Sequence, residues 1–309
     1  MSDPFGERLA RAVDARQSNV VLGLDPDPQR LWPDSHRAAG EGPPEQQLAR
    51  AVLAHCHLVV DAVAPAVVAL KPQVACFERL GAQGRTVLGA VCDHARGRGL
   101  LIIADAKRGD IDVSARAYAE AFLGETATPF GPVAGLGADA LTANPYMGAE
   151  TLTALLEVAR PHGRGLFVLV RTSNPGAADV EDLPTEPEGE PVWARVARMV
   201  DGLFDRAHGR SHSAQALSDV GAVVGATAPE HLARLRELMP RTPFLLPGVG
   251  AQGGSVEALS PAWAPGPAGG LVTASRSLVR AHESGGGEPA TAARAEAERL
   301  RATAWALAS

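Results

Sequence analysis

The sequence predicts a (β/α)8 barrel, the TIM-barrel class of α/β folds, formed by residues 1–309 as a single domain. Short apolar segments rich in Val, Ile and Leu alternate with longer helical patterns, as parallel strands and their covering helices do. Eight such segments occur, which is the number of strands that closes this barrel. Polar residues follow their C-terminal ends, where a barrel assembles its active site. An open doubly wound sheet is the alternative on the alternation alone, and the position of the polar residues favours the barrel.

The expected strands are brief and almost continuously apolar, which is typical of parallel strands buried on both faces. They cover 19–24, 66–70, 100–104, 139–143, 165–170, 222–225, 244–246 and 270–273. Helical periodicity predicts helices over 45–63, 85–98, 114–122, 149–160, 192–208, 229–238 and 291–308. The helix between the last two strands is poorly defined, and 253–259 is the best candidate. An amphipathic segment over 4–16 is expected to cap the bottom of the barrel.

Three segments are expected to be surface insertions on this barrel. Residues 26–45 are rich in proline, 179–191 are acidic with three prolines, and 205–218 are polar. None is long enough to form a second domain, so the chain is predicted to be one domain.

The composition excludes several classes of protein. The 309 residues are 46% hydrophobic and 21% charged, which permits a large core, and the formal net charge is −6. That charge argues against a nucleic-acid-binding protein, which needs a basic face to replace the counterions of the phosphates. The N-terminus has no apolar signal region, and no apolar run reaches the roughly 18 residues of a membrane span. We therefore expect a protein that binds neither nucleic acid nor membrane.

The three cysteines indicate a reducing compartment. Cys56, Cys76 and Cys92 show no CxxC or Cys/His ligand spacing, so they are expected to be free thiols of a cytoplasmic protein. His55 and His57 flank Cys56, which raises the question of a metal site. The run lies inside an apolar helical pattern, which favours core packing over metal binding.

An unusual group of charges follows the expected strand at 100–104. The sequence from Leu101 reads LIIADAKRGDI, which brings Asp105, Lys107 and Asp110 together. Asp105 and Lys107 point the same way because side chains alternate along a strand. Asp110 follows a turn and can return toward the same space. An ordinary ion-pair network is the plain alternative, and an Arg-Gly-Asp tripeptide is too short to indicate an adhesion motif.

Two further charges extend this group. Asp25 ends the first expected strand and Lys71 ends the second, and each alone could be a solvated charge. Together with Asp105 and Lys107 they alternate between acid and base. Such a chain fixes each lysine and leaves one ammonium group aimed at a reacting carbon, which suits electrostatic stabilisation and general-acid proton delivery.

The segment LPGVGAQGG, after the seventh expected strand, is the candidate phosphate site. Gly248, Gly250 and the residues up to Gly253 match the dinucleotide pattern G-x-G-x-x-G, but no convincing helix opens from them, which disfavours NAD. A loop with exposed backbone N–H groups is the better interpretation, because barrels often bind phosphate after strands seven and eight. Gln252 offers an amide, and Arg276, after the eighth strand, can grip phosphate oxygens. A tight turn and a surface arginine are the alternatives.

The fifth expected strand is followed by the sequence RTSNPG. The hydroxyl of Ser173 and the amide of Asn174 suit the recognition of a flat polar ring by hydrogen bonds. An ordinary turn before proline is the alternative.

Together these motifs resemble the orotidine 5′-phosphate decarboxylase family, in its longer bacterial form (type 2). The matching pieces are LGLDPDP, ALKPQ, DAKRGDI, RTSNPGA, VVGATAPEHL, LPGVGAQGG and ASRSL, spread over nearly the whole chain. The resemblance implies conversion of orotidine 5′-phosphate to UMP and CO2, the last step of de novo UMP synthesis. It also implies a barrel homodimer with active sites at the subunit interface, and neither a metal nor an organic cofactor.

The resemblance also assigns roles to the catalytic candidates. Lys107 would protonate C6 of the pyrimidine, and Asp105 would lie near the substrate carboxylate. Lys71 would contact the ribose and extend the charge network, and Asp110 would reach into the partner's site.

The substrate-binding candidates fall into three groups, for the ribose, the pyrimidine and the 5′-phosphate. They are Asp25 for the ribose, Ser173 and Asn174 for the pyrimidine, and Gly248, Gly250, Gln252 and Arg276 for the phosphate. Residues 108–109 and the segment 179–191 depart from the shorter members of the family, so loop contacts there are not implied.

Two other functions remain open at this point. A sugar-phosphate enzyme of the same superfamily, such as a hexulose-phosphate synthase, also carries D-x-K-x-x-D but uses Mg²⁺. A non-catalytic nucleotide-binding barrel would keep Arg276 and Gln252 but would not need Lys107.

Overall fold

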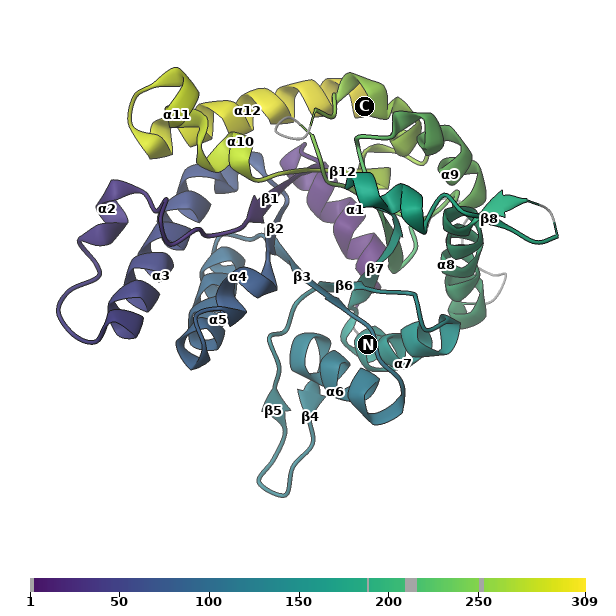
Figure 1. Cartoon of the computed structure of the whole chain (residues 1–309), viewed down its shortest axis with the longest axis horizontal. Helices are drawn as coiled ribbons and strands as arrows, with labels where there is room; N and C mark the ends of the chain where they lie inside the picture. The colour runs from purple at the N-terminus through teal and green to yellow at the C-terminus, as the bar shows by residue number, and fades with distance from the viewer. Residues whose placement is uncertain (1–2, 188, 209–215, 250–252) are drawn as a thin grey trace.

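The computed structural model describes residues 3–187, 189–208, 216–249 and 253–309. At its centre is a closed barrel of eight parallel strands, in the spatial order β1-β12-β11-β10-β7-β6-β3-β2 (Figure 1). Helices follow the strands and surround the barrel. The predicted (β/α)8 architecture is confirmed.

The eight expected strands are present, and in two of them a bound differs from the expected one by three residues or more. They are β1 (Val20–Leu24), β2 (Ala69–Pro72), β3 (Leu101–Arg108), β6 (Ala140–Ala143), β7 (Gly165–Arg171), β10 (Val220–Val224), β11 (Phe244–Leu246) and β12 (Gly270–Ala274). The first residue of the second expected strand, Ala66, belongs to the 3-10 helix η1 (Ala64–Ala66). β2 begins at Ala69 and runs to Pro72, which places Lys71 within the strand. β3 runs on to Arg108, so Asp105 and Lys107 lie within that strand and not after it.

The helices predicted from helical periodicity are present, together with several short ones. The α-helices are α1 (Phe5–Arg16), α2 (Pro33–His36), α3 (Pro44–Val63), α4 (Val74–Glu78), α5 (Ala82–Gly97), α6 (Asp112–Leu123), α7 (Ala149–Ala159), α8 (Val192–His208), α9 (Leu232–Leu238), α10 (Arg276–Val279), α11 (Ala281–Gly285) and α12 (Pro289–Ala308). Among the described residues, the other 3-10 helices are η2 (Arg160–His162), η3 (Pro175–Asp179), η5 (Pro229–His231), η6 (Glu257–Trp263) and η7 (Pro267–Gly269).

The helix predicted over 253–259 is wrong. Residues 253–256 are not helical, and the chain then forms the 3-10 helix η6 from Glu257, which contains Pro261. Proline has no backbone N–H to donate and crowds the preceding turn, so it disfavours an α-helix at this point. η6 and η7 together cover the barrel between β11 and β12.

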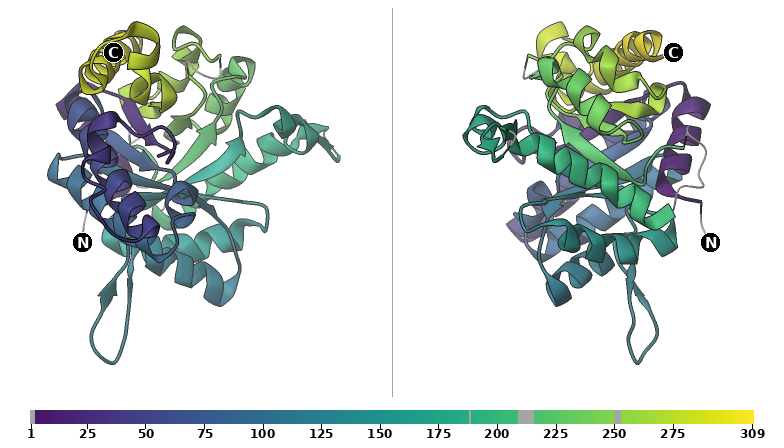
Figure 2. Two further views of the ribbon diagram at one scale, coloured as in Figure 1. Left: turned by 60° about the vertical axis from the view of Figure 1, so that its left-hand side comes forward. Right: turned by 90° about the vertical axis from the view of Figure 1, so that its right-hand side faces the viewer.

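The expected insertions take different forms. Residues 26–45 contain α2, and 179–191 form a two-stranded ribbon of β8 (Pro184–Thr185) and β9 (Glu190–Pro191). In the third, 205–208 belong to α8, and 209–215 lie outside the described residues. A second ribbon, β4 (Glu125–Thr126) and β5 (Val133–Ala134), was not expected from the sequence and projects from the body of the molecule (Figure 2).

The interior of the barrel is apolar in its lower part, and every strand contributes to it. The contributing residues are Val21, Ala69, Ile103, Ala140, Phe167, Val223, Leu245 and Leu271. Side chains alternate along a strand, so residues two positions further toward the C-terminal end face the same interior. In β2, β3, β6 and β12 those residues are Lys71, Asp105, Thr142 and Thr273. An apolar layer therefore supports a polar layer at the C-terminal end of the barrel.

Helix α1 closes the bottom of the barrel, as its amphipathic pattern predicts. Phe5, Leu9 and Val13 are buried and belong to the same apolar cluster as the barrel interior. The ring of Phe5 meets the ring of Phe167 edge to face, with 5.8 Å between ring centroids. Arg8 Nη1 also donates to the carbonyl oxygen of Gly163 (3.0 Å), which precedes β7.

The His55–Cys56–His57 run packs in the core, and its side chains have different neighbours. His55 Nδ1 accepts a hydrogen bond from the backbone N–H of Trp32 (3.0 Å), and burial lowers the pKa of His55 to about 4. Cys56 is buried, and burial raises the pKa of its thiol. His57 stacks on His94, with 4.0 Å between ring centroids. Within the described ranges, no cluster of three or more His, Cys, Asp or Glu side chains could hold a metal ion.

One helical segment is long and apolar enough to cross a membrane by length and composition. It spans Pro44–Ala66, that is α3 and η1, and 56% of its apolar window is buried inside the protein. Val52, Val59 and Val63 of α3 are fully buried in the core that joins the helices to the barrel. Packing in a barrel therefore accounts for the apolar character of this helix.

The closure of the barrel bottom predicts a large cost for truncating Phe5. We expect Phe5→Ala to lower the free energy of unfolding by about 3–5 kcal/mol, because the cavity left by a buried aromatic ring is filled only in part. Phe130→Ala is the matched control, since its side chain is 99% exposed, and should change stability by less than about 0.5 kcal/mol. Urea unfolding measures both variants, and similar values for the two would contradict the capping role of α1.

Candidate active site

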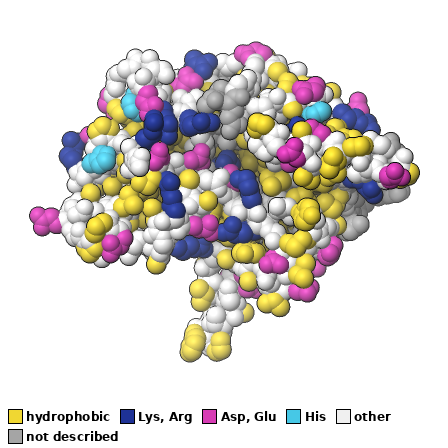
Figure 3. All heavy atoms as spheres, viewed as in Figure 1, with side chains coloured by type: hydrophobic (Ala, Val, Ile, Leu, Met, Phe, Trp, Pro, Cys, Tyr) yellow, Lys and Arg dark blue, Asp and Glu magenta, His cyan; other side chains and the backbone are white. Residues whose placement is uncertain are grey.

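A cavity of about 910 Å³ opens at the C-terminal end of the barrel. Eight of the predicted site residues line it, from six of the strands and the loops after them. They are Asp25, Lys71, Asp105, Lys107, Ser173, Asn174, Gly248 and Arg276. Lys and Arg side chains gather around the middle of this face of the molecule (Figure 3). Apolar side chains such as Leu169, Val223 and Leu245 line other parts of the same cavity.

The carboxylate of Asp105 is shared by two lysines. Lys71 Nζ lies 2.5 Å from Oδ2 of Asp105, and Lys107 Nζ lies 2.6 Å from Oδ1. Thr142 Oγ donates to Oδ1 (3.0 Å) and Gln73 Nε2 donates to Oδ2 (3.3 Å). Each carboxylate oxygen therefore has one ammonium group and one neutral donor.

The backbone of β3 is irregular where it presents these charges. Ala104 pairs with Leu141 and Arg108 with Ala143, so β3 carries two more residues than β6 between these pairs. Lys107 has φ of +49°, a left-handed conformation that is rare outside glycine. Its backbone N–H donates to Thr142 Oγ (2.9 Å), which stabilises this conformation. The bulge re-aims the lysine side chain back onto Asp105, as bulges near active sites often do.

The electrostatics of the cluster keep Asp105 ionised. Burial acts to raise the pKa of Asp105, but the charges and hydrogen bonds of Lys71 and Lys107 together outweigh it and lower the pKa to about 2. At neutral pH the cluster is therefore two ammonium groups around one carboxylate, with a net positive charge that faces the cavity.

The two lysines differ in their access to the cavity. The side chain of Lys71 is 8% exposed, whereas that of Lys107 is 45% exposed. Lys71 is thus a fixed counter-charge inside the barrel. Lys107 is the ammonium group that a bound molecule can reach.

Asp110 is not brought to the cavity of its own chain. It lies in the loop after β3, where its Oδ1 accepts from the backbone N–H of Ile111 (2.8 Å). It is absent from the described residues that line the cavity, unlike Asp105 and Lys107. The expectation that Asp110 returns to the same space as these two is therefore not met within one chain.

The predicted phosphate site lies on the opposite side of the cavity, at β11 and β12. Gly248 follows β11 with φ of +104°, and its carbonyl oxygen accepts from the backbone N–H of Gly254 (3.0 Å). Arg276 begins α10 directly after β12 and is exposed. Gly250 and Gln252 fall outside the described residues.

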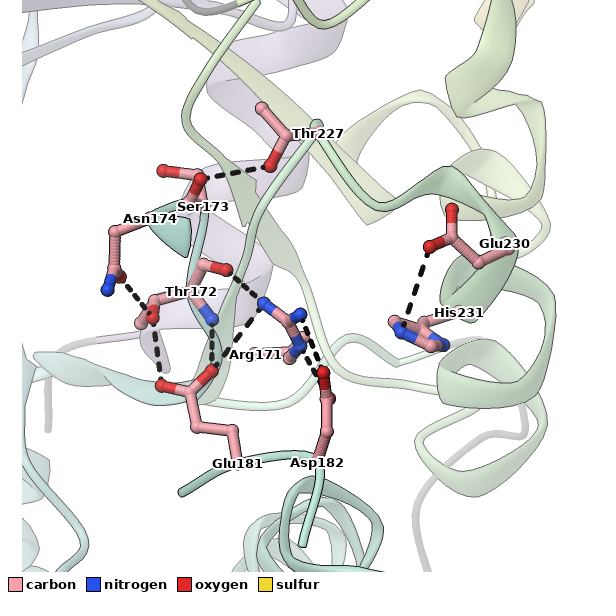
Figure 4. Close-up of polar contacts among 9 residues, drawn as sticks. All are labelled: Arg171, Thr172, Ser173, Asn174, Glu181, Asp182, Thr227, Glu230 and His231. Carbon is pink, nitrogen blue, oxygen red and sulfur yellow. Dashed lines mark hydrogen bonds and ion pairs between the residues drawn. The ribbon is translucent and has the colours of Figure 1, made fainter. Parts of the chain in front are cut away.

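The loop after β7 brings Ser173 and Asn174 to the cavity (Figure 4). Their neighbour Thr172 also lines it, and Thr172 Oγ lies 2.7 Å from Asn174 Oδ1. These polar groups lie between the charged cluster on β3 and the phosphate side at β11 and β12.

Three polar residues of the site were missed by the sequence analysis. Thr142 and Gln73 bond to Asp105, and Thr273 lines the cavity with a hydroxyl that has no hydrogen-bond partner among the described residues. Thr142 and Thr273 are the single polar residues of otherwise apolar strands. That pattern was a usable signal, because a polar residue in a buried strand needs a partner or a ligand.

Comparisons with known proteins bear on this arrangement. A family model described as "Orotidine 5'-phosphate decarboxylase / HUMPS family" matches residues 18–294, most of the chain. The chain belongs to this family.

Curated relatives and solved structures agree with this assignment. A protein of Rhodopirellula baltica named orotidine 5′-phosphate decarboxylase is 40% identical, over 90% of this chain and 89% of its own length. A protein of Deinococcus radiodurans with the same name is 39% identical, over 90% of each chain. The structure of Leishmania donovani OMP decarboxylase superposes with a TM-score of 0.72 at 30% identity and covers 98% of both chains.

The lowered pKa of Asp105 predicts a loss of stability in acid. A carboxyl whose pKa is lower in the folded than in the unfolded chain stabilises the fold above its unfolded pKa, near 3.8, and this contribution fades as the pH falls toward about 2. We expect the ionised Asp105 to add on the order of 2 kcal/mol to the free energy of unfolding at neutral pH, and this contribution to be lost between about pH 4 and 2.

Urea unfolding of wild type and Asp105→Asn across this range measures the effect. The difference in the free energy of unfolding between the two proteins should become smaller as the pH falls, because Asp105 becomes protonated. The other carboxyl groups titrate equally in both proteins and cancel in this difference. A difference that stays constant down to pH 2 would contradict the assignment.

Proposed function

We propose that this family member converts orotidine 5′-phosphate to UMP and CO2, with Lys107 as the proton donor to C6. The observation that carries the proposal is the arrangement of Lys71, Asp105 and Lys107. A buried carboxylate fixes two ammonium groups, and only that of Lys107 opens widely to the cavity.

This arrangement suits the difficulty of the reaction. Loss of CO2 leaves an electron pair at C6 that the pyrimidine ring cannot delocalise well. An ammonium group held at a fixed place stabilises that developing charge without reorganisation and then delivers a proton to it. Asp105 holds Lys107 in place, and Thr142 fixes the backbone of that lysine.

The remaining groups of the cavity suit the other parts of the substrate. Arg276 and the backbone after β11 would hold the 5′-phosphate, and Ser173 and Asn174 would bond to the pyrimidine ring. Asp25 would contact the ribose near the charged cluster. Binding energy from the phosphate can then be used to order the reacting end of the site.

The first test is the decrease in ultraviolet absorbance of orotidine 5′-phosphate with purified protein in EDTA. We expect turnover in wild type and a loss of at least about 10²-fold in Lys107→Ala, since proton delivery and charge stabilisation are both removed. The variant should still bind UMP. Activity that EDTA abolishes and Mg²⁺ restores would indicate a sugar-phosphate enzyme of the same family. Binding of UMP without turnover in wild type would indicate a nucleotide-binding barrel.

We also propose that two copies of the chain pair so that Asp110 completes the partner's active site. Asp110 lies outside the cavity of its own chain, and large apolar side chains beside the rim are exposed. Ile111 and Val113 lie within three residues of Asp110, and Tyr146 and Met147 follow β6. An exposed apolar patch next to an incomplete site is typical of an interface between subunits.

Hybrid dimers test this arrangement. Lys107→Ala and Asp110→Ala chains, each expected to be inactive alone, should regain about a quarter of wild-type activity when co-expressed, because half of randomly paired dimers are hybrids with one intact site. If Asp110 acted within its own chain, each site would carry one defect and no activity would return. Size-exclusion chromatography should show dimers in all samples.

We further propose that the whole chain acts as one barrel domain in the cytoplasm. The three cysteines are free, and burial raises the pKa of the Cys56 and Cys92 thiols, which suits a reducing compartment.

A further inference from the structure

The acidic ribbon over 179–191 is bonded at its base to the start of α8. The backbone N–H groups of Val192 and Trp193 donate to the carbonyl oxygens of Leu183 and Glu181, both at 2.9 Å. The first N–H groups of a helix have no partner inside the helix, so these bonds satisfy them. The base of the ribbon is therefore held at a defined place beside the end of β7.

From this base, two acidic side chains reach the loop after β7 (Figure 4). Asp182 forms a two-pronged ion pair with Arg171, with Nε to Oδ1 at 2.8 Å and Nη2 to Oδ2 at 2.9 Å. Glu181 accepts from both the backbone N–H and the hydroxyl of Thr172, each at 2.8 Å. Arg171 Nη1 also donates to the carbonyl oxygen of Thr172 (2.6 Å). The two acids thus restrain the two residues that precede Ser173.

The opposite side of the same loop is restrained by the segment after β10. The backbone N–H of Gly225 donates to the carbonyl oxygen of Arg171 (2.7 Å), and Thr227 Oγ donates to that of Ser173 (3.1 Å). A Cβ atom at Gly225 would lie 2.7 Å from Cα of Ser173, so glycine permits this close approach. Ser173 is therefore held between the barrel on one side and the ribbon on the other.

We propose that Glu181 and Asp182 are positioning residues that hold the 171–174 loop in the shape that presents Ser173 to the pyrimidine ring. This inference rests on the proposed function and gives the ribbon a role in it. Charge-assisted hydrogen bonds are stronger than neutral ones, and a loop ordered before binding loses less entropy when the ligand arrives. The acids of the ribbon, which is an insertion on the barrel, therefore raise the affinity of the site for the pyrimidine ring.

The test compares two ligands that differ in the pyrimidine ring. Glu181→Gln keeps the size of the side chain but turns an amide NH2 toward one of the two donors of Thr172. We expect it to weaken UMP binding by roughly tenfold and to leave ribose 5-phosphate binding within about twofold, because the phosphate and ribose groups lie elsewhere in the cavity. Isothermal titration calorimetry measures both. Asp182→Asn should act in the same direction, and it tests the same loop if Glu181→Gln does not fold.

Glu190→Gln is the matched control. Glu190 lies in the same ribbon but pairs with Arg198 of α8 and not with the loop, so UMP binding should not change. Two results would contradict the positioning role. One is an equal weakening of UMP and ribose 5-phosphate binding, and the other is UMP binding that neither Glu181→Gln nor Asp182→Asn changes. If wild type still turns over orotidine 5′-phosphate, these results leave the proposed function intact. A wild type that binds ribose 5-phosphate but not UMP would overturn the proposed function together with this inference.

Discussion

Two ammonium groups share the buried carboxylate of Asp105, and the geometry of the site depends on that contact. A carboxylate or an ammonium group alone inside a barrel would lose its hydration without compensation. Together, Asp105, Lys71 and Lys107 satisfy one another, and Thr142 and Gln73 fill the remaining acceptor positions. Neither Lys71 nor Asp105 can move away without leaving a buried charge unpaired. The barrel thereby holds a reactive ammonium group in one place before any ligand binds.

The rest of the fold supports this cluster from below and from the sides. An apolar layer with one residue from each strand, closed by α1, provides a dry floor beneath the charges. The loops of the rim have fewer such constraints, and they gain them from other segments. The ribbon beside α8 restrains the loop after β7, and the segment after β10 restrains it from the other side. Buried charges therefore hold the site in place at the end of the barrel, and the ribbon and the segment after β10 hold it in place at the rim.

Local sequence patterns predicted much of this arrangement. Eight apolar segments indicated eight strands, and the amphipathic segment over 4–16 indicated the helix that caps the barrel. That Asp105 and Lys107 face the same space was predictable because the two lie two residues apart on a strand, whereas their direct contact depends on the bulge in β3. Patterns failed where packing overrides local preference. β2 begins at Ala69 and not at residue 66, because the 3-10 helix η1 ends there. The α-helix predicted over 253–259 is absent, and the 3-10 helix η6 begins at Glu257.

The sequence by itself determined the strands, their order along the chain, the family motifs and the charges at the rim, because each of these features depends only on residues that are close together in the sequence. Only the tertiary structure decided which of these charges meet. Thr142 and Gln73 reach Asp105 from other strands or loops, and the acids of the ribbon reach Arg171 and Thr172 only because the ribbon turns back beside α8. The tertiary structure also places Asp110 outside the cavity of its own chain, although Asp110 is close to Lys107 in sequence. Contacts across the barrel depend on how the strands close and bulge, and no local pattern encodes that geometry.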